Sequence, residues 1–87
     1  MGLFKIVLKG SSEQDLQKID RQYIPKILDA IESLAENPFP VQSRKMKGSE
    51  SIYRLRIGDY RAIYQVHSED KAVEIYYIRH RKDAYKR

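Results

Sequence analysis

Three arginines lie close together in the stretch YRLRIGDYRAIY, residues 53–64, and the forked guanidinium group matches phosphate oxygens well. Arg54 and Arg56 alternate with apolar residues before a Gly-Asp pair, and Arg61 follows that pair. A two-residue Gly-Asp turn predicts a β-hairpin in which Arg56 lies opposite Arg61 and Arg54 lies opposite Ile63. The three arginines then share one face of the sheet, hereafter the arginine face.

Like charges directly opposite each other destabilise a pair of strands, by roughly half a kcal/mol or more. A bound anion would offset this repulsion, so the convergence of three guanidinium groups favours a phosphate-binding site. An acidic neighbour is the alternative: Glu74, predicted opposite Gln65 on the same face, or Glu50 would neutralise part of the charge. The sequence leaves both explanations open.

The next predicted strand adds candidates to the arginine face. A four-residue loop at 68–71 would set Arg61 opposite Ile78. Tyr76 and His80 would then lie on the arginine face, where the Tyr76 ring could stack on a nucleobase. The pattern therefore indicates that this face binds a nucleic acid strand.

A basic tail, RHRKDAYKR, follows the last predicted strand at residues 79–87. Such a tail is typical of an arm that follows a phosphate backbone, and equally of a solvated chain end. Two lysines that precede the hairpin could add to the same surface. The basic candidates of these two segments are Arg81, Lys82, Lys86, Arg87, Lys45 and Lys47.

Cleavage of a phosphodiester without a metal needs charge stabilisation and proton transfer. Attack of the ribose 2′-OH on its own phosphodiester is a reaction of this kind, and arginines would stabilise the negative charge of its transition state. Arginine is a poor base because its pKa lies above ~12. His80 and Tyr85 are nearby groups with more suitable pKa values, and Lys45 or Lys47 would serve if desolvated.

The composition limits the other chemistries. The 87 residues include no cysteine, and the two histidines, His67 and His80, have no carboxylate cluster beside them. No metal and no cofactor is therefore expected, and neither a Gly-rich phosphate loop nor a nucleophile elbow is present. The apolar runs are too short for a signal peptide or a membrane span, so we expect a cytoplasmic protein with no membrane partner.

The positive charge belongs to the second half of the chain. Residues 1–43 carry five Lys and Arg against six Asp and Glu, whereas residues 44–87 carry twelve against six. The net charge of +5 therefore comes from the half that holds the arginines. A one-sided basic balance indicates a polyanion such as nucleic acid, or an acidic protein, as partner.

Hydrophobic periodicity predicts the elements of the first half. Residues 3–9 are apolar at odd and even positions, which predicts a strand inside the sheet with both faces covered. A short helix is expected to begin at Ser11 or Ser12, with the hydroxyl as its N-cap. Apolar residues at helical spacing over 24–35 predict a longer amphipathic helix with Pro25 in its first turn.

The second half reads as a polar linker over 37–51 and three strands at 52–57, 60–67 and 72–80, which form an antiparallel meander. Both helices must bury an apolar stripe against one side of this sheet, so the arginine face stays open. A chain of this length can build only one thin core. We therefore predict a single α+β domain over residues 1–87 with the order β-α-α-β-β-β.

Two segments together resemble a known family: KMKGSESIYRLRIGDYRAIYQV, residues 45–66, and YYIRHRKDAYKR, residues 76–87. With the LAENPF ending of the long helix, they are similar to the RelE branch of the RelE/ParE superfamily of bacterial toxins. The resemblance implies a RelE-like microbial RNase fold. It also implies an endoribonuclease that cuts mRNA in the ribosomal A site and so inhibits translation.

The positions that match the family's functional residues are Arg54, Arg56, Arg61, Arg81 and Tyr85. Our hypothesis is that Arg61 and Arg81 clamp the phosphate and stabilise the transition state. Arg54 and Arg56 would position the RNA backbone. His80 or Tyr85 would transfer protons, because an arginine effectively never loses its proton.

The resemblance also implies partners. A RelB-type antitoxin would wrap the toxin in a hetero-oligomer, and the target would be the ribosome, with its 16S rRNA and the mRNA in the A site. Two alternatives stay open: a ParE-like inhibitor of DNA gyrase with the same fold, and a non-catalytic module whose basic face binds only the antitoxin.

Overall fold

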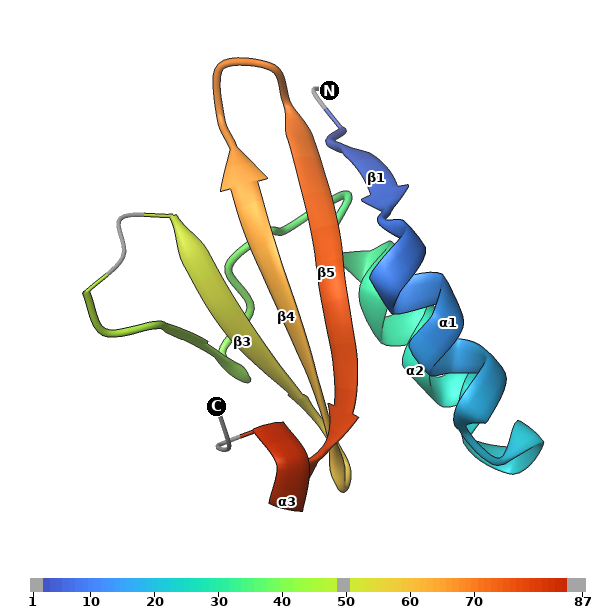
Figure 1. The fold of residues 1–87 in the computed structure, drawn as a ribbon. Helices are drawn as coiled ribbons and strands as arrows, with labels where there is room; N and C mark the ends of the chain where they lie inside the picture. Colours follow the sequence, from blue (N-terminus) through green and yellow to red (C-terminus); the bar gives the residue numbers. More distant parts are fainter. Residues whose placement is uncertain (1–2, 49–50, 85–87) are drawn as a thin grey trace.

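Figure 1 shows the fold in the computed structural model of the chain, which describes residues 3–48 and 51–84. A mixed five-stranded sheet carries two helices on one side, as expected for an α+β domain. The elements in chain order are β1 (Lys5–Leu8), α1 (Gly10–Lys18), the 3-10 turn η1 (Arg21–Tyr23), α2 (Ile24–Ser33), β2 (Ser43–Lys45), β3 (Ile52–Ile57), β4 (Tyr60–His67), β5 (Ala72–His80) and α3 (Arg81–Ala84).

The sheet has the order β1-β5-β4-β3-β2, and only the β1–β5 pair is parallel among the described strands. The three strands of the meander begin and end at the predicted residues. Two expectations were wrong. β1 lies at an edge of the sheet instead of inside it, and the predicted linker contains the short edge strand β2.

The position of β1 explains why apolar residues at both odd and even positions misled the prediction. Ile6 and Leu8 pack against the core from the helix side. Val7 points to the other side, where it lines a shallow hollow with Lys5 and His67. Apolar residues can therefore lie on both faces of an edge strand, because partial burial on each face is sufficient.

The β3–β4 hairpin has the predicted register, with Arg56 opposite Arg61 and Leu55 opposite Ala62. Gly58 has φ +59° in the turn, a conformation that glycine adopts without steric strain. Tyr53, Leu55 and the other residues of this parity face the helices. The opposite parity makes the arginine face, which α1 and α2 do not cover (Figure 1).

The β4–β5 register differs from the prediction because β5 contains a β-bulge. Tyr64 lies opposite Ile75 but Ile63 lies opposite Tyr77, so Tyr76 is the extra residue. Every side chain of β5 after the bulge changes face relative to an unbulged strand. Ile78 therefore lies opposite Ala62 in the core rather than opposite Arg61.

The core lies between α2 and the sheet. Ile27, Ile31 and Leu34 are fully buried on the predicted stripe of the long helix. The α-helix ends at Ser33, three residues before Glu36, near which Pro38 predicts its end, and Pro25 lies in its first turn as expected. The buried sheet residues that meet this stripe are Leu55, Ile57, Ala62, Tyr64, Val66, Val73, Ile75 and Ile78.

Helix α1 covers the edge of β5 beyond the end of β1. The Ser11 hydroxyl donates to the Tyr76 carbonyl, and the Asp15 carboxylate accepts the Ile78 N–H at 2.9 Å. The predicted serine N-cap was therefore wrong: Lys9 is the N-cap residue, and no side chain caps the helix. Ser11 and Asp15 thus form hydrogen bonds with main-chain groups at the edge of β5 instead of capping the helix.

Candidate anion-binding face

Residues opposite each other on neighbouring strands share a face, and the observed registers place five arginines on the arginine face. One row of side chains crosses β2, β3, β4 and β5, and a second row lies two residues nearer the hairpin turn. The first row is Arg44, Arg54, Ile63 and Tyr77, and the second is Arg56, Arg61 and Arg79. The prediction that Arg54, Arg56 and Arg61 share one face is thus confirmed, and Arg44 and Arg79 are two further members of that face.

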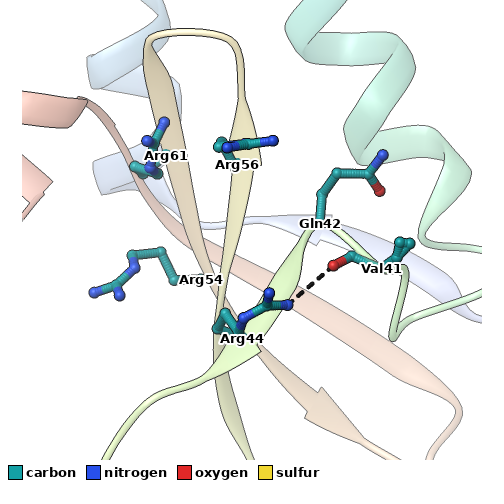
Figure 2. Close-up of a pocket in the computed structure, with 6 residues that line it drawn as sticks. All are labelled: Val41, Gln42, Arg44, Arg54, Arg56 and Arg61. Atoms are coloured by element: carbon teal, nitrogen blue, oxygen red, sulfur yellow. Dashed lines mark hydrogen bonds between the residues drawn. The ribbon is translucent and has the colours of Figure 1, made fainter.

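Figure 2 shows an open groove of about 380 Å³ on this face, hereafter the arginine groove. Arg44 and Arg54 lie at one end, Arg61 lies near the hairpin turn, and Arg56 extends from β3 toward the segment that precedes β2. The lining residues are Val41, Gln42, Arg44, Arg54, Arg56 and Arg61. Four of these six side chains are cationic, so the groove is suited to an anion.

Main-chain carbonyl groups hold two of the guanidinium groups. Arg61 Nη1 donates to the carbonyls of Gly58 and Tyr60, both at 2.9 Å. Arg44 Nη1 donates to the carbonyls of Val41 and Ser43, both at 3.0 Å. A carbonyl orients a guanidinium without cancelling its charge.

Glu74, the first acidic candidate, makes its described contacts with residues other than the arginines. Within residues 3–48 and 51–84, no ion pair forms on Arg44, Arg56 or Arg61. Glu74 instead lies 2.7 Å from His67 Nε2 and 3.6 Å from Lys9 Nζ. Glu50, the other candidate counter-ion, lies outside the described residues.

Arg81 follows directly after β5 and lies near Arg56 and Arg61. Its N–H donates to the Asp59 carbonyl at 2.7 Å, and its Nε lies 3.9 Å from Asp59 Oδ1. A second hollow, which passes around the edge of β3 toward α2, is lined by Lys26, Gln42, Arg56, Arg61 and Arg81 among others. Arg81 therefore lines one hollow together with Arg56 and Arg61.

His80 does not lie on the arginine face, because the bulge reverses its parity. It is opposite Tyr60 and packs edge-on against that ring, with the centroids 5.5 Å apart. The Lys82 N–H lies 3.3 Å from Nδ1 and donates to it. The predicted placement of His80 is wrong, and its role in proton transfer stays a prediction.

Tyr76 is a polar side chain of the sheet rather than a free ring. Its hydroxyl donates to Gln65 Oε1 at 2.6 Å and lies 3.2 Å from Glu74 Oε1. Burial, followed by the Glu74 charge, raises the pKa of Tyr76. The hydrogen bond from His67, ahead of those from its other partners, lowers the pKa of Glu74. These contacts fix the Tyr76 hydroxyl to its neighbours on the sheet, and stacking of its ring on a base stays a prediction.

The remaining predicted RNA-binding residues are dispersed. Lys45 lies opposite Tyr53, on the parity of the helix side, and Lys47 and Lys82 are exposed outside both basic hollows. The predicted residues Tyr85, Lys86 and Arg87 lie outside the described part of the chain.

Sequence reasoning missed Arg44 and Arg79 as members of the arginine face. Arg44 belongs to a three-residue strand, too short for a periodic signal. Arg79 lies in the predicted tail, where an unbulged register gives it the wrong parity. Gln42 and Arg44 are polar residues two positions apart, a spacing that could have indicated the exposed edge strand β2.

Metal ligands and membrane-spanning helices are not found in the described part of the chain. No group of three or more His, Asp or Glu side chains gathers there. No helix among residues 3–48 and 51–84 has the length and apolar composition needed to cross a membrane.

Residues 6–85 match the family described as the ParE toxin of the type II toxin–antitoxin system parDE. A protein named RelE1 from Methanocaldococcus jannaschii is 36% identical over 86 residues, which cover 95% of this chain and 96% of that protein. Both comparisons span nearly the whole chain.

Solved structures show the same fold. The archaeal RelE–RelB complex from Pyrococcus horikoshii OT3 contains a chain with a TM-score of 0.80 and 26% identity, and the match covers 91% of this chain and 96% of that one. The isolated RelE toxin of E. coli gives a TM-score of 0.77 at 16% identity, with 88% and 83% covered. At that identity the similarity concerns the fold alone.

Proposed function

This chain belongs to the RelE/ParE superfamily of toxins from type II toxin–antitoxin systems, and we propose that it is a metal-independent endoribonuclease that cleaves mRNA in the ribosomal A site. The observation that carries the proposal is the arginine groove, which Arg44, Arg54, Arg56 and Arg61 line on an open face of the sheet. A groove with this charge is suited to the backbone of a single RNA strand.

The proposed reaction is intramolecular transesterification. The ribose 2′-oxygen forms a bond to phosphorus while the bond from phosphorus to the 5′-oxygen breaks. A base takes the 2′-OH proton and an acid protonates the leaving oxygen, which gives a 2′,3′-cyclic phosphate and a free 5′-OH. Negative charge builds up on the phosphoryl oxygens during this step, and fixed cations stabilise it.

The arginines divide this work by position. Arg61 and Arg81, which share the hollow at the hairpin turn, clamp the scissile phosphate and stabilise its transition-state charge. Arg54 and Arg56 hold the flanking backbone along the groove. The forked guanidinium group suits both tasks because it offers paired donors to phosphate oxygens.

Proton transfer is assigned to His80 or Tyr85. His80 lies one residue before Arg81, at the end of β5 nearest the hairpin turn. An imidazole suits either role, because its protonated form gives up a proton and its neutral form takes one. Arginine cannot take the role of the base, because its pKa is above ~12.

The proposed partners follow from the family. A RelB-type antitoxin would neutralise the toxin in a hetero-oligomer, as in the RelE–RelB complex of Pyrococcus horikoshii. The ribosome and its mRNA would be the target, which places the protein in the cytoplasm. An acidic antitoxin segment would compete with RNA for the arginine groove, because both are anionic.

Mapping of mRNA 5′ ends by primer extension after induction of the toxin tests the activity. We expect cuts in phase with the codons of translated messages. The family description names the ParE toxin, so inhibition of DNA gyrase is the second candidate. DNA damage without mRNA cuts would support gyrase inhibition, and neither effect would indicate an antitoxin-binding module.

Substitution of the clamp tests the assignment of residues. Arg61→Ala and Arg81→Ala are each expected to lower the rate of cleavage on programmed ribosomes by roughly 10²–10³-fold, the usual loss when a transition-state donor is removed. Arg21→Ala on η1 is the matched control and should leave the rate unchanged, because Arg21 is exposed and lines neither basic hollow. Wild-type rates in both clamp variants, with unchanged circular dichroism, would contradict the assignment.

A further inference from the structure

Tyr77 is an exposed aromatic residue on the arginine face, with 41% of its surface accessible. The bulge at Tyr76 is what turns it to this side, since Tyr77 lies opposite Ile63 and an unbulged strand would set it among the core residues. The bulge therefore buries one tyrosine hydroxyl in a polar network and presents the next ring to solvent.

Two charged residues form a chain of contacts that begins at the Tyr77 ring. The Arg79 guanidinium lies 4.5 Å from the ring centroid, a cation–π contact. Arg79 Nε in turn lies 3.3 Å from Asp15 Oδ2, and the Asp15 side chain is only 15% exposed. Because Asp15 also accepts the Ile78 N–H, helix α1 fixes both Arg79 and the strand that carries the ring. A fixed ring loses little conformational entropy when a ligand stacks on it.

The neighbours of Tyr77 are apolar on one side and cationic on the other. Ile63 lies directly opposite on β4, and Arg54 lies opposite Ile63 on β3. The next row holds Arg61 opposite Arg79. An exposed aromatic ring opposite an aliphatic residue and next to guanidinium groups matches a nucleotide, whose planar base is joined to a phosphate.

We propose that Tyr77 and Ile63 form a stacking shelf for an unpaired base of the RNA whose phosphates lie in the arginine groove. This inference rests on the proposed function and adds a base-binding subsite to it. Stacking on an aromatic ring tolerates every base, because each base has a π-face. The shelf therefore holds the strand in place and leaves the choice of codon to other contacts.

A cycle of one protein change and one RNA change tests the shelf. Single-turnover cleavage is measured on ribosomes programmed with a normal message, and with three messages in which one A-site nucleotide at a time is abasic. Tyr77→Ala is expected to lower cleavage of the normal message by roughly 5- to 100-fold, the usual effect of one lost stacking contact. Tyr77→Phe should retain wild-type cleavage because it keeps the ring.

The abasic messages separate stacking from a structural effect. At one A-site position, loss of the base should slow the wild-type protein as Tyr77→Ala does, and should slow Tyr77→Ala no further. Tyr23→Ala is the control, because Tyr23 is equally exposed, at 43%, but lies on η1. It should cleave all four messages as the wild type does.

Three results would overturn the shelf. They are cleavage by Tyr77→Ala at the wild-type rate, an equal loss on every message including all three abasic ones, and weaker inhibition by the antitoxin with unchanged cleavage, which would assign Tyr77 to the antitoxin interface. Absence of cleavage by the wild-type protein on the normal message would refute the proposed function as well. The failure of the shelf alone and the failure of the function are thus distinct.

Discussion

Backbone carbonyls, rather than carboxylates, orient two arginines of the arginine groove. Arg61 and Arg44 each donate through Nη1 to two carbonyl groups of their own neighbourhood. The direction of each guanidinium is fixed, while its positive charge is left to attract an anion. A lysine could not replace either residue fully, because its ammonium group lacks the planar fork that makes such a double contact compatible with phosphate binding.

Tyr64 gives a prediction about stability and pH. It is fully buried, its hydroxyl donates to the Pro38 carbonyl at 2.7 Å, and burial raises its pKa to about 12 from 10.0. Tyr64→Phe leaves that carbonyl without its donor, so the free energy of unfolding at pH 7 is expected to fall by roughly 1–2 kcal/mol. Urea unfolding followed by circular dichroism measures this loss.

The same group makes the wild-type protein sensitive to alkali. Since the folded-state pKa of Tyr64 is the higher one, the unfolded chain releases this proton first as pH rises above 10. The wild type should lose roughly 1.4 kcal/mol to this group by about pH 11, a loss that Tyr64→Phe lacks. Tyr23→Phe on the exposed η1 should behave as the wild type. Parallel stability curves for wild type and Tyr64→Phe would refute the burial argument.

At the scale of elements, helix α1 acts as a substitute strand along the edge of β5. β1 pairs with β5 only as far as Ile75, and the polar groups of the next residues meet α1 instead. The Asp15 carboxylate connects this edge to Arg79 on the arginine face. The helix therefore couples the packing of the fold to the position of a candidate RNA-binding residue.

Asp15→Ala is expected to lower the free energy of unfolding by roughly 1–3 kcal/mol, because the Ile78 N–H and Arg79 both lose an acceptor. Asp15→Asn should lose less, since its amide oxygen can still accept the Ile78 N–H. Urea midpoints give the stability, and hydrogen exchange of the Ile78 amide reports the strand edge directly. Asp29→Ala, at an exposed site on α2, should stay within about 0.5 kcal/mol of wild type. An Asp15→Ala midpoint equal to that of the wild type would contradict this role.

The elements were predictable where one local signal decided them. Turn chemistry at Gly58-Asp59 defined the hairpin, and the apolar stripe of residues 24–35 defined the long helix. The bulge at Tyr76 was not predictable, because it lies in the four-residue apolar run Ile75–Ile78, where no alternation marks which side chain faces the core. That single residue moved His80 off the arginine face and moved Tyr77 and Arg79 onto it.

At the scale of the whole molecule, the two sides of the sheet have separate tasks. The helix side holds the buried core, and the arginine face gathers cations from four strands, β2 to β5. The sequence predicted three of these five arginines, because one hairpin carries them. Arg44 and Arg79 come from segments that only the tertiary fold brings beside that hairpin. Five of the twelve Lys and Arg residues of the second half thus lie on one face.

A concentrated cationic face predicts a steep salt dependence of RNA binding. Each phosphate contact on a single strand contributes a slope of about −0.7 to log K against log[salt], so four contacts among the five arginines give about −3. Fluorescence anisotropy with a labelled single-stranded oligoribonucleotide between roughly 50 and 200 mM salt measures this slope. Arg44→Gln should bring the slope closer to zero by about 0.7, because one contact is lost. Arg21→Gln removes the same charge from η1 and should leave the slope unchanged, whereas an equal change in both variants would mean that net charge, and not the arginine face, governs binding.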